Sequence, residues 1–189
     1  MVRRVDKFRI ILSVCLIILV LSSPLLAENY TKAADFNLRD PWDKYFSLSQ
    51  FKDRLVILNF FRIYCGGRVA LQTEKQFQEL NKICQKFCKD KNCQDADVVI
   101  IGITLATCPT TDLKEWAKYH KISWLLGNDY DDYNLDVFNS YAKVLFNLRD
   151  PALIFVNKDQ EIVFASNYLD SFQIINKLIE IQPDLKEKE

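Results

Sequence analysis

Runs and periods of apolar residues divide this chain of 189 residues into strands and helices. Continuous apolar runs over 55–61, 97–105 and 152–156 suit strands that are buried on both faces of a sheet. Helical spacing of apolar residues predicts a long helix over 67–89 and a closing amphipathic helix over 172–181. The expected architecture is therefore a sheet covered by helices.

Shorter patterns predict the remaining elements. In chain order they are an N-terminal hairpin over 35–48, a turn over 49–53, a helix that a capping box begins at Asp112, an edge strand over 122–126, a helix over 137–145, and a return strand over 161–165 after the turn 157–160. The last two strands must pair antiparallel because a short turn joins them. We therefore predict a three-layer α/β/α sandwich with a mixed central sheet.

The first 27 residues have the pattern of a signal peptide. A basic segment precedes an apolar run over 10–21, and small residues lead to a cleavage site after Ala27. The apolar run is short for a membrane span, so the expected contact with a membrane is only through this segment if it stays uncleaved. We expect export, to the periplasm, of a single domain over 28–189.

Charge and cysteine content narrow the class of protein. The net charge is zero, which gives no support for a nucleic-acid partner. One of the six cysteines lies in the signal segment, and the other five would reach an oxidising compartment where disulfides persist. Because five is odd, at least one of them is free or pairs with another molecule. The five are Cys65, Cys84, Cys88, Cys93 and Cys108.

Cys65 stands where the first predicted core strand gives way to the long helix. Gly66 and Gly67 follow it, and glycine lets another backbone approach closely. Unpaired N–H groups at a helix start favour the thiolate, which is the reactive form of cysteine. The guanidinium of Arg68 would also be near this thiolate. These features predict a nucleophile at Cys65, with an inert cysteine at a lost active site as the alternative.

Several motifs carry a resemblance to a known family. They are Asp35-Phe36-x-Leu38, Leu48-Ser49-x-Phe51-Lys52, the run from Val56 to Phe61, Cys65, and Asp150-Pro151-x-x-Ile154-Phe155-Val156. The chain resembles the thioredoxin-like superfamily over about 34–181, and within it the exported redoxins of the TlpA type and their peroxiredoxin relatives. It departs from the family's Cys-x-x-Cys, because the second cysteine falls on Arg68, and Tyr64 replaces the usual tryptophan.

The resemblance implies both a fold and a substrate site. The fold would be the thioredoxin-like sandwich with an N-terminal β-hairpin. Pro151 would have a cis peptide bond and face Cys65, and the backbone of Asp150 would bind the substrate chain. An ordinary trans proline that starts a strand is the alternative. Together with these two residues, Tyr64, Gly66, Gly67 and Arg68 are the expected substrate-binding positions.

Cys108 is the expected redox partner of Cys65. Each cysteine follows the carboxyl end of a predicted core strand, and the ends of parallel neighbours meet at one edge of a sheet. A disulfide would need Cα atoms roughly 4.4–6.8 Å apart. The alternative is that Cys108 is a free thiol in a loop.

The other cysteines and polar clusters point to structure more than to catalysis. Cys84 and Cys88 share one side of the long helix, and one of them is the candidate for a structural disulfide to Cys93; buried free thiols are the alternative. No histidine lies near them in sequence, so we expect no metal site, and we expect no cofactor. His120, the single histidine, is expected on the surface, and Asp129, Asp131 and Asp132 in a solvated acidic loop.

These features favour thiol–disulfide exchange or antioxidant defence through Cys65. The expected partners are protein thiols or disulfides, or a small thiol reductant. The first alternative is a binding module without turnover, which Arg68 favours because it replaces the second cysteine. A peroxidase of the peroxiredoxin type is less favoured, because Leu58 and Arg62 replace the proline and the hydroxyl residue of that family's motif.

Overall fold

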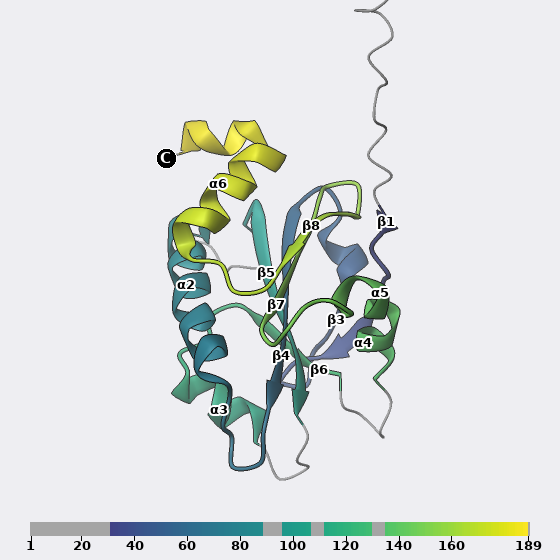
Figure 1. Cartoon of the computed structure of the whole chain (residues 1–189), viewed down its shortest axis with the longest axis vertical. Helices are drawn as coiled ribbons and strands as arrows, with labels where there is room; N and C mark the ends of the chain where they lie inside the picture. The colour runs from purple at the N-terminus through teal and green to yellow at the C-terminus, as the bar shows by residue number, and fades with distance from the viewer. Residues whose placement is uncertain (1–30, 89–95, 107–111, 130–134, 189) are drawn as a thin grey trace, which may run out of the picture.

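The computed structural model describes residues 31–88, 96–106, 112–129 and 135–188 (Figure 1). The strands are β1 (Thr31–Lys32), β2 (Asn37–Arg39), β3 (Tyr45–Ser47), β4 (Leu55–Ile63), β5 (Val98–Ala106), β6 (Leu125–Asn128), β7 (Ala152–Val156) and β8 (Glu161–Ser166). The helices are α2 (Leu71–Cys88), α3 (Leu113–Tyr119), α4 (Asp136–Ser140), α5 (Ala142–Leu145) and α6 (Ser171–Ile181), with 3₁₀ turns η1 (Leu48–Phe51) and η2 (Pro183–Lys188).

The central sheet is mixed, as the sequence predicts. Its strand order is β1-β8-β7-β4-β5-β6. Strand β4 pairs parallel with β5 and antiparallel with β7, and β5 pairs parallel with β6. The predicted N-terminal hairpin forms a separate two-stranded sheet of β2 and β3. This arrangement is the predicted thioredoxin-like α/β/α sandwich.

The two faces of the sheet carry separate cores because side chains alternate along each strand. Helices α2, α3 and α6 cover one face, and α4, α5 and the hairpin cover the other (Figure 1). Along β4, Ile57 and Phe61 belong to the first core, whereas Leu58 and Phe60 belong to the second. Burial of β4 on both faces explains its continuous apolar run.

Two predicted helices differ from the structure. The predicted helix over 67–89 begins only at Leu71, because Gly66 and Gly67 have positive φ angles and a bridge between Tyr64 and Arg68 closes a turn before it. The predicted helix over 137–145 is divided at Tyr141 into α4 and α5. Within the described residues, none of the helices has the length and apolarity needed to cross a membrane.

Candidate active site at the carboxyl edge of the sheet

Cys65 lies in a tight loop two residues beyond the end of β4. The N–H of Tyr64 donates to the carbonyl of Arg68 at 2.7 Å, and the N–H of Gly67 donates to the carbonyl of Tyr64 at 3.0 Å. The φ angles of +81° at Gly66 and +74° at Gly67 are left-handed, which explains why glycine follows the cysteine. The side chains of Cys65 and Arg68 are exposed. The loop therefore presents Cys65 to solvent on a fixed backbone.

Cys65 and Cys84 are both disulfide-bonded. Cys65 precedes the first turn of α2, whereas Cys84 lies near the helix's other end, roughly 20 Å further along its axis at 1.5 Å per residue. A disulfide joins Cα atoms no more than about 7 Å apart, so the two cysteines belong to different disulfides. The predicted partners Cys93 and Cys108 lie outside the described residues, as does the side chain of Cys88.

The segment before β7 reaches the same edge of the sheet. The peptide bond between Asp150 and Pro151 is cis. The Asp150 carboxylate accepts from the Thr73 hydroxyl at 2.9 Å and from the Arg62 N–H at 3.3 Å. Asp150 therefore connects this segment to the first turn of α2 and to the end of β4.

Burial has the largest influence on the pKa of the Asp150 carboxyl. Its removal from water raises the pKa of the carboxyl above the ordinary value, because burial penalises the charged form. The hydrogen bonds from Thr73 and from the Arg62 N–H, and the nearby Arg62 charge, oppose this rise in pKa.

Trp116, which lies in α3, contacts the Cys65 loop through its indole ring. Its indole Nε1–H donates to the carbonyl of Gly67 at 2.8 Å, and its ring stacks on Phe61 with centroids 5.8 Å apart. No sequence motif marks this residue as part of the site. The capping box at Asp112 predicted the helix that carries it, but no local pattern indicates which loop its indole would meet.

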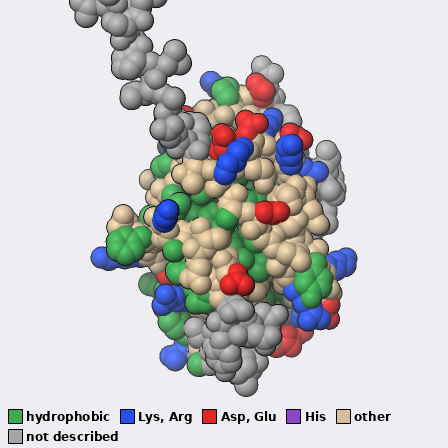
Figure 2. All heavy atoms as spheres, turned by 90° about the vertical axis from the view of Figure 1, so that its right-hand side faces the viewer, with side chains coloured by type: hydrophobic (Ala, Val, Ile, Leu, Met, Phe, Trp, Pro, Cys, Tyr) green, Lys and Arg blue, Asp and Glu red, His purple; other side chains and the backbone are tan. Residues whose placement is uncertain are grey.

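A pocket of about 300 Å³ opens beside Tyr64 on the side of α4 and α5. Its apolar lining includes Leu105, Phe138, Leu145 and Leu148, and Arg62 and Arg149 contribute charged groups. Figure 2 looks at this side of the molecule and shows hydrophobic side chains across its middle with charged side chains around them.

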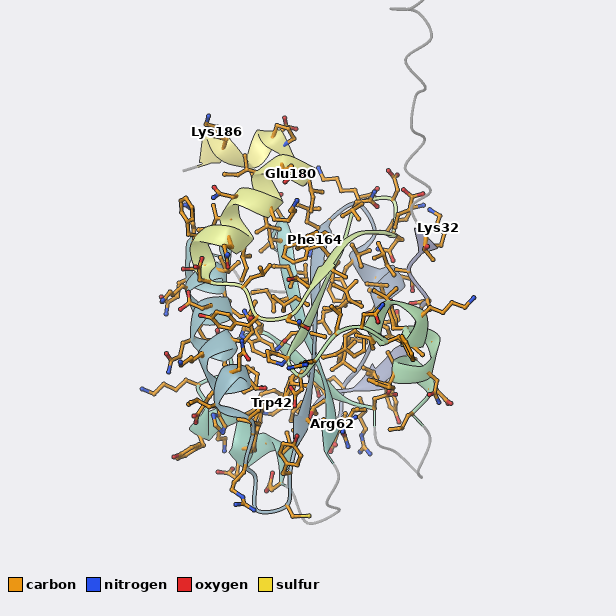
Figure 3. All side chains as sticks on the ribbon, viewed as in Figure 1. Lys32, Trp42, Arg62, Phe164, Glu180 and Lys186 are labelled. Carbon is orange, nitrogen blue, oxygen red and sulfur yellow. The ribbon has the colours of Figure 1, made fainter. Side chains whose placement is uncertain are left out.

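Two arginine side chains and the carboxylate of Asp150 give this pocket its charges. Both Arg62 and Arg149 are exposed, and no ion pair among the described residues includes either of them. Arg62 lies toward the end of the sheet to which β4 runs (Figure 3). The pocket therefore offers apolar walls, two arginine side chains without an ion pair among the described residues, and the Asp150 carboxylate, beside the loop that carries Cys65.

Two expectations about polar residues are wrong. His120 is partly buried, and its ring lies 4.4 Å from that of Trp116; burial lowers the pKa of this imidazole. Asp129 is buried and accepts from the N–H groups of Val137 and Phe138 at the start of α4. Both residues were expected in solvent, but contacts with elements distant in sequence bury Asp129 and partly bury His120, whose ring also lies 5.9 Å from that of Phe77. Asp131 and Asp132 lie outside the described residues.

No group of histidine, cysteine and acidic side chains within the described part of the chain could hold a metal ion. Asp150 and His120 are acid–base groups at this edge of the sheet: Asp150 accepts from the Arg62 N–H of β4, and the His120 ring packs on Trp116.

The comparisons with known proteins agree with the fold. No family model matches the chain, and no curated protein matches it. Among solved structures, the thioredoxin domain of a thiol-disulfide oxidoreductase from Bacteroides vulgatus is 23% identical, with a TM-score of 0.61 over 79% of this chain and 94% of that one. A putative protein disulfide isomerase from Bacteroides thetaiotaomicron is 23% identical, with a TM-score of 0.60 over 84% and 93%.

A more distant structure gives a similar match. A DsbF homologue from Corynebacterium diphtheriae is 12% identical, with a TM-score of 0.63 over 82% of this chain and 88% of that one. At these identities the similarity establishes the thioredoxin-like fold of this chain.

Proposed function

We propose that this protein is an exported thiol–disulfide oxidoreductase whose working disulfide joins Cys65 to Cys108. The observation that carries the proposal is the disulfide-bonded, solvent-exposed Cys65 in the loop after β4. Reactive disulfides must be accessible to an attacking thiolate. The structural neighbours described as thiol-disulfide oxidoreductases also support this class of reaction.

The register of the sheet supports Cys108 as the partner. Ile63 of β4 is opposite Ala106 of β5 in a parallel pair. In sequence, Cys65 and Cys108 each follow these residues by two positions, so a continuation of this register would place them opposite each other. Neighbouring strands lie about 4.8 Å apart, which is within the Cα separation of a disulfide.

The exchange needs no group beyond thiols. A substrate thiolate attacks the sulfur of Cys65, the bond to Cys108 breaks, and Cys108 leaves as a thiolate. A second substrate thiolate then attacks the substrate sulfur of this mixed disulfide and releases Cys65. One protein disulfide and two substrate thiols thus become one protein dithiol and one substrate disulfide. In the opposite direction the protein dithiol reduces a substrate disulfide, and two molecules of a small thiol reductant then reduce the resulting protein disulfide by the same steps.

The pocket beside Tyr64 is the proposed substrate site. It combines apolar walls with the cations of Arg62 and Arg149 next to Cys65. Apolar pockets with a few polar groups are typical of ligand sites. We assign to this site a substrate segment that carries an apolar side chain and a carboxylate close to its cysteine. Asp150 lines the same pocket.

A binding module without turnover is the second candidate. The replacement of the family's second cysteine by Arg68 favours it, because a neighbouring thiol could not resolve a mixed disulfide at Cys65. The two candidates differ in one measurable property, which is whether the disulfide of Cys65 exchanges with external thiols.

Disulfide mapping and an insulin-reduction assay test the proposal together. Peptide mass spectrometry of the mature, non-reduced protein should join Cys65 to Cys108 and give a new N-terminus after Ala27. Cys65→Ser should abolish insulin reduction by dithiothreitol-recycled protein. Cys84→Ser is the matched control, since it removes the other disulfide and should lower stability without loss of turnover. Activity like that of the wild type in Cys65→Ser would refute the proposal.

A further inference from the structure

Among the hydrogen bonds of the described residues, one from a side chain of α3 reaches the Cys65 loop. The indole Nε1–H of Trp116 donates to the Gly67 carbonyl at 2.8 Å, across 49 positions of sequence. The ring is only 6% exposed and is fixed by stacking on Phe61 and by an edge contact with Phe77 at 5.7 Å. The donor is therefore rigidly placed, because two rings of the core determine its orientation.

The loop is shaped to receive this indole. A Cβ atom at Gly67 would lie 3.4 Å from Cδ1 of Trp116, which is a tight contact. The loop's other hydrogen bonds, between Tyr64 and Arg68 and between Gly67 and Tyr64, are internal to it. They fix the shape of the loop but do not attach it to α3.

Helix α3 begins five residues after Cys108. Asp112 caps it by accepting from the N–H groups of Lys114 and Glu115, and Trp116 lies one turn further on. The hydrogen bond from Trp116 to Gly67 therefore joins the helix that follows one cysteine to the loop that carries the other. This connection does not depend on the disulfide itself.

We propose that Trp116 is a positioning residue for the redox pair. It holds the Cys65 loop against α3 while the disulfide is open, so that the two thiols stay within reach of each other. In a Cys-x-x-Cys turn the short chain between the cysteines would do this. Here 42 residues separate them, and a non-covalent connection replaces that turn. The inference rests on the proposed pairing of Cys65 with Cys108.

The equilibrium with glutathione measures this effect. The reduced protein and one molecule of glutathione disulfide give the protein disulfide and two molecules of glutathione. The constant of this exchange is an effective concentration of one protein thiol at the other. Trp116→Phe keeps a buried aromatic ring but removes the N–H donor. We expect this substitution to lower the effective concentration about three- to fivefold. The net contribution of one hydrogen bond sets the upper limit of this change.

Trp124→Phe is the matched control. Trp124 is also buried, at 4% exposed, and its Nε1–H donates to Asn81 at 3.0 Å, so the same chemical group and a similar hydrogen bond are lost. It has no hydrogen bond to the Cys65 loop among the described contacts. We expect its glutathione equilibrium to match that of the wild type. Equal constants in the two variants would overturn the role of Trp116.

A second measurement uses the unchanged protein. The indole N–H proton of Trp116 should remain protected from hydrogen exchange after the disulfide is reduced, as that of Trp124 does. Trp42, which is 47% exposed, gives the rate of an accessible indole. Exchange at the Trp116 indole as fast as at Trp42 in the reduced protein would show that the connection is lost with the disulfide, and would overturn the inference.

The disulfide map separates the two possible failures. A map that joins Cys65 to a cysteine other than Cys108 overturns the proposed pairing, and the positioning role falls with it. A map that shows the proposed pair, together with an unchanged glutathione equilibrium in Trp116→Phe, overturns only the positioning role.

Discussion

Replacement of Thr73 by valine tests how the segment before Pro151 is held at the active edge. The Thr73 hydroxyl is fully buried and donates to the Asp150 carboxylate at 2.9 Å. Valine has nearly the same shape and a similar helix propensity. The substitution therefore removes one hydrogen bond and leaves a buried carboxylate with one partner fewer. We expect the free energy of unfolding to fall by about 1.5–3 kcal/mol, the range for a hydrogen bond to a charged group.

Thr104→Val is the matched control for this change. Thr104 is also fully buried, but its hydroxyl has no hydrogen-bond partner among the described residues. It lies in β5, where valine is favourable. The same substitution should therefore be neutral, or stabilising by up to about 1 kcal/mol, because it removes an unpaired polar group. Guanidinium denaturation at pH 7.5, followed by tryptophan fluorescence, measures both variants.

The pH dependence gives an independent check. Burial raises the pKa of Asp150, so the folded protein binds this proton more readily than the unfolded chain does. Ionisation of Asp150 therefore lowers the free energy of unfolding at neutral pH. This loss decreases as the pH falls below the folded-state pKa and is gone below the unfolded-state pKa. The hydrogen bond from Thr73 opposes the rise in pKa. Its loss should raise the pKa further and make the deficit of Thr73→Val largest at neutral pH.

Two results would refute this reasoning. One is an equal effect of the two substitutions at pH 7.5, because the hydrogen bond would then contribute nothing. The other is a deficit of Thr73→Val that grows when Asp150 is protonated, because a donor stabilises the charged carboxylate more than the neutral one.

Two further predictions concern the pocket and the core. The double substitution Arg62→Glu and Arg149→Glu should raise KM about tenfold for peptide disulfides with an acidic residue beside the cysteine, through loss of charge pairing. A neutral peptide should show little change in steady-state kinetics, and an equal rise for both peptides would contradict the assigned substrate. Gly102→Ala would place a Cβ atom 2.4 Å from the Trp124 ring. It should lower the free energy of unfolding by about 1–3 kcal/mol, and an unchanged midpoint in urea would show that the core adapts.

Local patterns predicted most of the fold. The continuous apolar runs identified β4, β5 and β7, because a strand buried on both faces needs apolar residues at successive positions. Helical spacing identified α2 and α6, although not the turn that delays the start of α2. The order of these elements along the chain predicted a mixed sheet, since a short turn forces the last two strands to be antiparallel.

Solvent exposure could not be predicted where distant segments meet. Asp129 was expected in a solvated loop, but it caps α4 from a buried position. His120 was expected on the surface, but its ring packs against that of Phe77 in α2. Polarity predicts exposure only on average, because a buried polar group is acceptable when other segments supply its hydrogen bonds.

The sequence by itself determined the sandwich, the place of Cys65 after the first core strand, and the glycines that shape its loop. The tertiary structure decided the surroundings of that cysteine. The hydrogen bond from Trp116 to Gly67 spans 49 positions, and that from Thr73 to Asp150 spans 77. A periodic pattern reports the face on which a residue lies, but it carries no information on which distant loop will meet that face. Such contacts arise only when the sheet brings the carboxyl ends of its strands to one edge.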